Sequence, residues 1–195
     1  ERFSLPAHME RPIFANITRL TGQKGVDLMM QVAGDILASG AYIISLGSGE
    51  KRYEDFWQTL RDLAPYQVGI YRGYNEPLAH FIEAGADMFM MPSKFEPCGL
   101  NQMYSLRYGT VPIVRAVGGL EDTVQNWDAV TGSGNGFKFG PYRGDRFLES
   151  IYESLFAFSD QGSWLQIQKN GMNIDNSWEN AARKYVELYK WATTL

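Results

Sequence analysis

Short apolar runs alternate along the chain with longer segments in which apolar residues recur every three or four positions. The short runs are typical of buried strands, and the longer segments are typical of amphipathic helices. This pattern predicts strands at residues 12–19, 41–49, 67–74, 87–93, 110–119 and 137–140. It predicts helices or helical turns at residues 26–40, 50–65, 75–86, 99–109, 120–125, 143–158, 161–172 and 177–195. Asn75, with Pro77 in the first turn, is the expected cap of the third of these helices, and Ser177 is the expected start of the last one.

The strand–helix alternation indicates the fold class. Strands that are each followed by a helix form a mainly parallel sheet with helices on both faces and right-handed crossovers. We therefore expect a doubly wound, Rossmann-like α/β fold in a single domain, residues 1–195, whose C-terminal helices begin at about residue 143. The last helix is amphipathic, and its apolar face is expected to pack either on this domain or on a neighbouring one.

Composition excludes several classes of protein. The net charge of −4 argues against a nucleic-acid-binding surface. No run approaches the roughly 20 apolar residues of a membrane helix, and the first residues lack the apolar core of a signal peptide, so a cytoplasmic protein is expected. Cys98, with only His8 and His80 beside it, cannot build a disulfide framework or a Cys/His metal cluster, and neither metal nor cofactor is expected.

Three loops that follow predicted strands carry the candidate chemistry, at residues 18–25, 95–100 and 116–123. They should meet at the carboxyl edge of the sheet, where open α/β proteins bind ligands. Arg19 and Lys24 in the first loop suit the oxygens of a diphosphate, although an isolated Arg19 more often pairs with a surface acid. The other two loops offer backbone N–H groups with little side-chain obstruction, at Gly99, Leu100, Gly118 and Gly119.

Single residues near these loops allow two interpretations each. Glu96 precedes a predicted helix, so it is either a helix cap or a site residue. Tyr74 either stacks on a base or simply packs. Cys98 has no histidine nearby in the sequence and is expected to line a pocket rather than act as a nucleophile, and His80 is given no role. The chain contains neither a phosphate loop of the GxxxxGK[ST] type nor a complete dinucleotide fingerprint.

Three segments together resemble one enzyme family. "TRLTGQKGVDL", "GYNEPLAHFIEAGADMFMMPSKFEPCGLNQMYSLRYGTVPIVRAVGGLEDTV" and "NSWENAARKYVELY" are similar, in order and spacing, to the C-terminal domain of bacterial glycogen synthases and plant starch synthases. The resemblance runs from about Pro12 to Tyr189. It implies the donor-binding half of a GT-B enzyme, which transfers glucose from ADP-glucose to the non-reducing end of an α-1,4-glucan with retention of configuration, through a front-face path or a covalent intermediate. A plant protein of this family would reside in the plastid.

The resemblance also implies roles for residues. Arg19 and Lys24 match the family's phosphate-binding pair, and Glu96 matches the acid beside the transferred glucose. The remaining matched positions are those that bind the donor: Tyr74 at the adenine, Cys98 in the glucose pocket, and Gly99 and Leu100 at the phosphate.

Two departures from the wider family affect the expectations. The second acid, eight residues after Glu96, is Tyr104 here. This replacement fits the glycogen and starch synthase branch and puts recognition of a ribose by a carboxylate in question. The family's N-terminal domain has no counterpart in the chain, so the glucan is expected to bind through that absent domain. The isolated chain is therefore expected to be inactive, with an exposed apolar patch where the two domains would meet.

Three alternatives remain open at the level of the sequence. One is a UDP-glucose-dependent retaining glucosyltransferase of the sucrose synthase type, against which Tyr104 argues. The second is a non-catalytic nucleotide-binding module that partners another chain. The third is a flavodoxin-like regulatory domain, which would explain the sheet but not the set of Arg19, Lys24 and Glu96.

Overall fold

The structure is a computed structural model that describes residues 3, 5–6 and 11–194. In this part of the chain, six strands form one sheet in the order β3-β2-β1-β4-β5-β6, and every neighbouring pair is parallel. The strands are β1 (Ile13–Ile17), β2 (Tyr42–Gly47), β3 (Val68–Arg72), β4 (Met88–Met91), β5 (Val111–Arg115) and β6 (Phe137–Phe139). This is the strand order of the dinucleotide-binding Rossmann fold.

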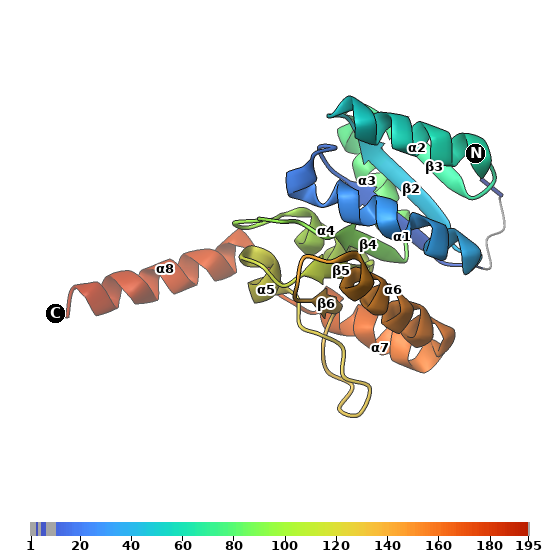
Figure 1. Cartoon of the computed structure of the whole chain (residues 1–195). Helices are drawn as coiled ribbons and strands as arrows, with labels where there is room; N and C mark the ends of the chain where they lie inside the picture. Colours follow the sequence, from blue (N-terminus) through green and yellow to red (C-terminus); the bar gives the residue numbers. More distant parts are fainter. Residues whose placement is uncertain (1–2, 4, 7–10, 195) are drawn as a thin grey trace.

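Helices follow the strands and cover both faces of the sheet (Figure 1). The first strand is followed by a 3-10 turn, η1 (Gly22–Lys24), before α1 begins. The helices are α1 (Val26–Ala38), α2 (Lys51–Leu63), α3 (Glu76–Gly85), α4 (Asn101–Tyr108), α5 (Gly119–Thr123), α6 (Gly144–Ser159), α7 (Gln161–Met172) and α8 (Trp178–Ala192). The predicted doubly wound fold is confirmed.

The core lies in two layers, one on each face of the sheet. Successive side chains of a strand point to opposite faces, so Phe14 enters one layer while Ala15 enters the other. The first layer packs the strands against α1, α2, α6 and α7, and the second packs them against α3 and α5. Because each strand is apolar on both faces, the sequence shows continuous apolar runs rather than alternation.

Local signals position the helices that carry the site. The Asn75 side chain accepts a hydrogen bond from the N–H of Leu78 at 2.9 Å, and Pro77 lies in the first turn of α3, as the sequence predicted. At the last helix, the hydroxyl of Ser177 accepts the N–H of Asn180 at 3.2 Å. Both predicted caps are confirmed.

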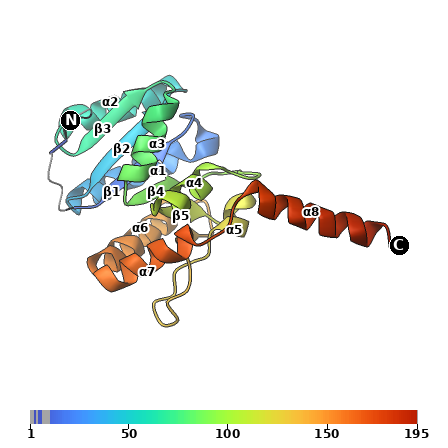
Figure 2. The ribbon, with the colours of Figure 1, turned by 180° about the vertical axis from the view of Figure 1, so that it is seen from behind.

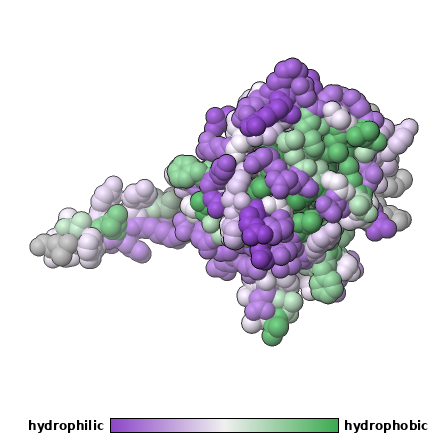
Figure 3. Space-filling model, in the orientation of Figure 1, coloured by the Kyte–Doolittle hydropathy of each residue, from purple (hydrophilic) through white to green (hydrophobic). Residues whose placement is uncertain are grey.

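Helix α8 projects away from the rest of the chain (Figures 1 and 2). None of its residues is buried, and apolar and polar side chains lie side by side along it in Figure 3. Of the two alternatives for this amphipathic helix, packing on its own domain is not seen in the described structure, and packing on a neighbouring domain stays a prediction. Among the described residues, no helix combines the length and apolar character that crossing a membrane requires.

Candidate functional site

A cavity of about 660 Å³ opens at the carboxyl ends of β1 and β4. These strands are neighbours in the sheet although β2 and β3 lie between them in the sequence. The chain reverses its direction of winding at this point, which is where open α/β sheets form their binding crevices. The volume suits a small organic ligand.

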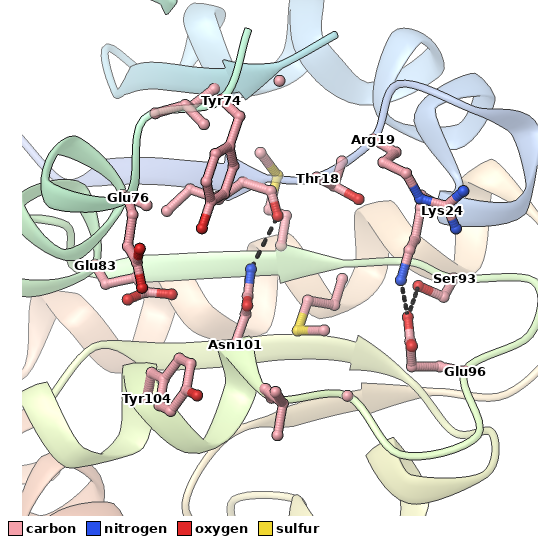
Figure 4. A pocket seen from close by; sticks show the side chains of 18 of the residues that line it. Thr18, Arg19, Lys24, Tyr74, Glu76, Glu83, Ser93, Glu96, Asn101 and Tyr104 are labelled. Atoms are coloured by element: carbon pink, nitrogen blue, oxygen red, sulfur yellow. Dashed lines mark hydrogen bonds and ion pairs between the residues drawn. The ribbon is translucent and has the colours of Figure 1, made fainter. Parts of the chain in front are cut away.

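Lys24 and Glu96 form an ion pair in this cavity (Figure 4). The Lys24 Nζ donates to Glu96 Oε2 at 2.5 Å, and the Ser93 hydroxyl donates to the same oxygen at 3.2 Å. The Glu96 side chain is 9% exposed and the Lys24 side chain is 20% exposed. Helix α4 has Leu100 as its N-cap residue and no side-chain cap. Glu96 is therefore not a helix cap; it lines the cavity, and its role there stays a prediction.

The loops that carry Lys24 and Glu96 pack directly on each other. Gly25 has a φ of 75°, and a Cβ there would lie 2.0 Å from the carbonyl oxygen of Pro92. The N–H of Lys94 donates to the Gln23 carbonyl at 2.8 Å, and the Gln23 side chain donates to the Phe95 carbonyl at 3.3 Å. Only glycine at position 25 permits this contact, which fixes the pair of charged residues relative to each other.

Hydrogen bonds from two further side chains, Arg115 and Tyr142, stabilise these loops. Arg115, at the end of β5, donates through Nε to the Ser93 carbonyl at 2.7 Å. The Tyr142 hydroxyl donates to Asp27 Oδ1 at 2.5 Å and to the Gly22 carbonyl at 3.3 Å, and burial together with the Asp27 carboxylate raises the pKa of Tyr142. Neither Arg115 nor Tyr142 was predicted from the sequence. A charged residue at the carboxyl end of a buried strand was the one signal that pointed to Arg115.

Arg19 lies beside Lys24 on the cavity wall (Figure 4). Within the described residues, neither an ion pair nor a hydrogen bond engages its guanidinium group. The alternative in which Arg19 pairs with a surface acid therefore finds no support in this part of the chain. Arg19 and Lys24 together make this end of the cavity cationic.

The loop before α4 forms the floor beside Glu96. Cys98, Gly99 and Leu100 line the cavity, and Gly99 has a φ of 75°. The buried side chain of Gln102 donates to the carbonyl oxygens of Cys98 and Gly99, each at 3.1 Å. These contacts turn the carbonyl groups away, while the N–H groups in the first turn of α4 have no partner within the helix. Such N–H groups suit an anion.

Gly118 and Gly119 do not line the cavity. A Cβ on Gly118 would lie 2.2 Å from the Glu96 carbonyl oxygen, and one on Gly119 would lie 2.2 Å from the Cys98 carbonyl oxygen. The Gly119 N–H donates to the carbonyls of Glu96 and Pro97, at 3.1 and 3.2 Å. The expectation that Gly119 offers an unobstructed N–H group to a ligand is therefore wrong in this structure. Both glycines instead allow the Glu96 loop to approach α5.

The opposite end of the cavity is aromatic and acidic. Tyr74 lies on its wall and is 79% exposed, and it follows Gly73, whose φ is 118°. Glu76, Glu83 and Tyr104 lie near it in Figure 4, separated from Lys24 and Arg19 by Asn101. His80, which was given no role from the sequence, also lines the cavity.

Exposed apolar side chains surround the cavity. Phe95, Leu100, Tyr74 and Tyr104 are all exposed large apolar residues at or beside its wall. They form an exposed apolar rim, and that a second domain meets the chain at this rim stays a prediction. Among the described residues there is no cluster of His, Cys, Asp and Glu side chains that could hold a metal ion; His8 lies outside them.

The pattern of the family described as "Glycosyl transferases group 1" matches residues 1–156. The chain belongs to this family. Within it, the chain is 47% identical over 190 residues to a glycogen synthase of Koribacter versatilis, covering 97% of this chain and 39% of that protein. It is 46% identical over 188 residues to a glycogen synthase of Bacillus cereus, covering 96% of this chain and 40% of that protein. The resemblance drawn from the sequence is confirmed, and the chain spans about two fifths of the length of these relatives.

Solved structures share the fold of the chain. The catalytic domain of starch synthase IV from Arabidopsis thaliana, bound to ADP and acarbose, superposes with a TM-score of 0.87 at 33% identity, covering 99% of this chain and 41% of that chain. Sucrose-phosphate synthase from Thermosynechococcus elongatus superposes with a TM-score of 0.73 at 22% identity, which shows the fold alone. The chain thus has the fold of one half of a GT-B glycosyltransferase.

Proposed function

We propose that the chain is the donor-binding part of a retaining glucosyltransferase of the glycogen and starch synthase type. In this proposal, the enzyme transfers glucose from ADP-glucose to the non-reducing end of an α-1,4-glucan. The observation that carries the proposal is the cationic end of the cavity at the switch point, where Arg19 and Lys24 lie beside the buried Glu96. The similarity to glycogen synthases and to a starch synthase solved with ADP supports it.

The proposed roles follow from the chemistry of each group. Arg19 and Lys24 bind the diphosphate and neutralise the charge that develops on it as the bond to glucose breaks. The N–H groups of Gly99 and Leu100 add hydrogen bonds to the same phosphate oxygens. Glu96 accepts hydrogen bonds from the sugar hydroxyls and stabilises positive charge at the anomeric carbon, and Cys98 lines the glucose pocket.

The nucleoside occupies the other end of the cavity in this proposal, with the adenine on the Tyr74 ring. An exposed aromatic face beside a cavity suits a planar base, because stacking needs no particular hydrogen-bond pattern. Gly118 and Gly119 act indirectly, through the position of the Glu96 loop. No metal ion or cofactor takes part.

The rest of the relatives' length is proposed to bind the glucan. A glucosyl transfer requires donor and acceptor to be held together in a site closed to water. We therefore expect the 195-residue chain to bind ADP without elongating a glucan. Steady incorporation of labelled glucose into glycogen by this chain alone would contradict the assignment of acceptor binding to another domain.

Calorimetric titration of the chain with ADP, UDP and AMP tests the proposed donor site. ADP is expected to bind in preference to UDP, and AMP more weakly than ADP because it lacks the second phosphate. Each of Arg19→Ala and Lys24→Ala should weaken ADP about tenfold to a hundredfold, as expected for the loss of a charge-assisted hydrogen bond. UDP binding in preference to ADP would favour the UDP-glucose alternative.

Two surface substitutions serve as matched controls. Lys138→Ala removes a lysine that is also 20% exposed and paired with an acid, Glu121, outside the cavity. Arg146→Ala removes an arginine paired with Glu149 on α6. Equal losses of ADP affinity in the control and cavity variants would mean that net charge, not the cavity, controls binding, and the proposal would fail.

A further inference from the structure

The end of the cavity farther from Lys24 contains a carboxylate with no assigned function. Glu83 lies on α3, lines the cavity, and is only 2% exposed. Burial raises the pKa of the Glu83 carboxyl, and the hydrogen bond and charge of His80 oppose that rise. A carboxylate is costly to bury unless its oxygens have hydrogen-bond donors. The site therefore favours a ligand that brings donors to Glu83.

His80 fixes the Glu83 side chain through one of its two oxygens. His80 Nδ1 lies 3.0 Å from Glu83 Oε2. The His80 ring is held edge-on to the Tyr104 ring, with a centroid distance of 5.8 Å, and is tilted against the Tyr108 ring at 6.3 Å. Among the described residues, no other side chain forms a hydrogen bond with this carboxylate. Glu83 is thus oriented while its other oxygen stays available.

The position of Glu83 decides which part of a nucleotide it meets. Figure 4 shows Glu83 and Glu76 at the end of the cavity where Tyr74 lies, with Arg19 and Lys24 at the opposite end. Two carboxylates repel phosphate, so the phosphates bind at the cationic end and the nucleoside near the acids. A nucleoside offers two adjacent hydroxyl donors on its ribose, which match an oriented carboxylate acceptor.

We infer that Glu83, oriented by His80, accepts hydrogen bonds from the ribose hydroxyls of the bound nucleotide and selects for ribonucleotides. This inference rests on the proposed function, which places a nucleoside diphosphate in the cavity. Tyr104 occupies the position of the wider family's second acid and orients His80 by ring contact. Glu83 supplies a carboxylate from a different helix, α3.

The test measures binding of five probes to the chain by calorimetry: ADP, 2′-deoxy-ADP, 2′,3′-dideoxy-ADP, inosine diphosphate and inorganic diphosphate. The unchanged chain should bind ADP about tenfold to a hundredfold more tightly than 2′,3′-dideoxy-ADP, as hydrogen bonds to a charged acceptor imply. Glu83→Gln should weaken ADP binding, because a neutral amide is a weaker acceptor than a carboxylate. It should bring the affinities for ADP and 2′,3′-dideoxy-ADP to within about threefold of each other. Inorganic diphosphate should bind the variant and the unchanged chain equally.

Asp87→Asn is the matched control. Asp87 is also a carboxylate, partly buried, but it lies outside the cavity and accepts the N–H of Ile13 at 2.8 Å. Its substitution should leave the ratio of ADP to 2′,3′-dideoxy-ADP affinity unchanged. A purely structural effect of losing a carboxylate would appear in both variants as a changed melting temperature.

Each outcome either supports the inference or overturns it. If the unchanged chain binds ADP and the dideoxy analogue equally, or if Glu83→Gln keeps the full discrimination, the inference is wrong while the donor site stands. If Glu83→Gln changes only the ratio of the affinities for ADP and inosine diphosphate, Glu83 contacts the base instead of the ribose, and the inference is wrong. If neither ADP nor inorganic diphosphate binds the unchanged chain, the proposed function fails as well.

Discussion

Replacing Glu96 by glutamine should tighten the binding of inorganic diphosphate. In the free protein, Lys24 Nζ is already bonded to Glu96 Oε2 at 2.5 Å, so a phosphate must compete with this carboxylate. A phosphate oxygen bonded to Lys24 would lie at most about 5 Å from the Glu96 oxygen, given a usual charge-assisted N–O distance of about 2.8 Å.

The size of the effect follows from that separation. Two negative charges about 5 Å apart repel each other by about 0.8–1.7 kcal/mol at an effective dielectric constant between about 40 and 80, the range suited to an open cavity. Removing the carboxylate charge should therefore tighten diphosphate binding about fourfold to seventeenfold. The same substitution should abolish glucosyl transfer by an enzyme that contains both domains, because Glu96 is proposed to stabilise the reacting sugar.

Calorimetry with inorganic diphosphate measures the effect directly, since this probe contacts neither the sugar nor the nucleoside end. Glu121→Gln is the control, because Glu121 pairs with Lys138 at 2.7 Å outside the cavity and its loss changes the net charge equally. Unchanged or weaker diphosphate binding by Glu96→Gln, with Glu121→Gln unaffected, would refute the idea that Glu96 competes for Lys24.

Three further predictions concern stability. Gly119→Ala should lower the melting temperature and weaken ADP binding, because its Cβ would lie 2.2 Å from a carbonyl oxygen of the neighbouring loop, whereas Gly34→Ala, on open helix surface, should be neutral or stabilising. Asn75→Ala should lower the free energy of unfolding in urea by about 1 kcal/mol, with Asn75→Ser nearly unchanged, because its side chain caps α3 at the Leu78 N–H. Burial raises the pKa of the Asp87 carboxyl, despite the opposing backbone hydrogen bond, so its contribution to stability is present below the unfolded pKa of about 3.9 and is lost as the pH rises through the folded pKa. Asp87→Asn should flatten the dependence of the unfolding free energy on pH over that window, and an unchanged slope would contradict this.

The sequence predicted the elements because the fold is built from local signals. Continuous apolar runs marked the strands, and Asn75 and Ser177 marked two helix starts. The predicted strands were too long at their carboxyl ends: the run 110–119 ends as a strand at Arg115. Pairing decides this boundary, because β4 ends at Met91 opposite Val114 and β6 ends at Phe139 opposite Arg115, after which the chain turns towards α5. The end of a strand therefore depends on its neighbours in the sheet and cannot be predicted from its own apolar run.

The site was predictable in its charges but not in its contacts. Arg19, Lys24 and Glu96 stood out as polar residues after apolar strands. The ion pair between Lys24 and Glu96 joins positions 72 residues apart, so no local pattern contains it. Gly119 was taken for a ligand contact because a glycine at a loop tip allows either a ligand or another backbone to approach. Only the fold shows that backbone fills the space.

The Lys24–Glu96 pair connects these findings to a cycle of binding and release. In the free protein, the pair keeps a buried carboxylate compensated and holds Lys24 where a phosphate would arrive. In the proposed reaction, bound diphosphate competes with Glu96 for Lys24, which frees the carboxylate for the sugar. After glucose leaves, Lys24 and Ser93 are again the side-chain partners of Glu96 among the described residues, and the return of Lys24 to Glu96 favours loss of the diphosphate. The hydrogen bonds from Arg115 and Tyr142 hold the loops of Glu96 and Lys24 in place while Lys24 changes its partner.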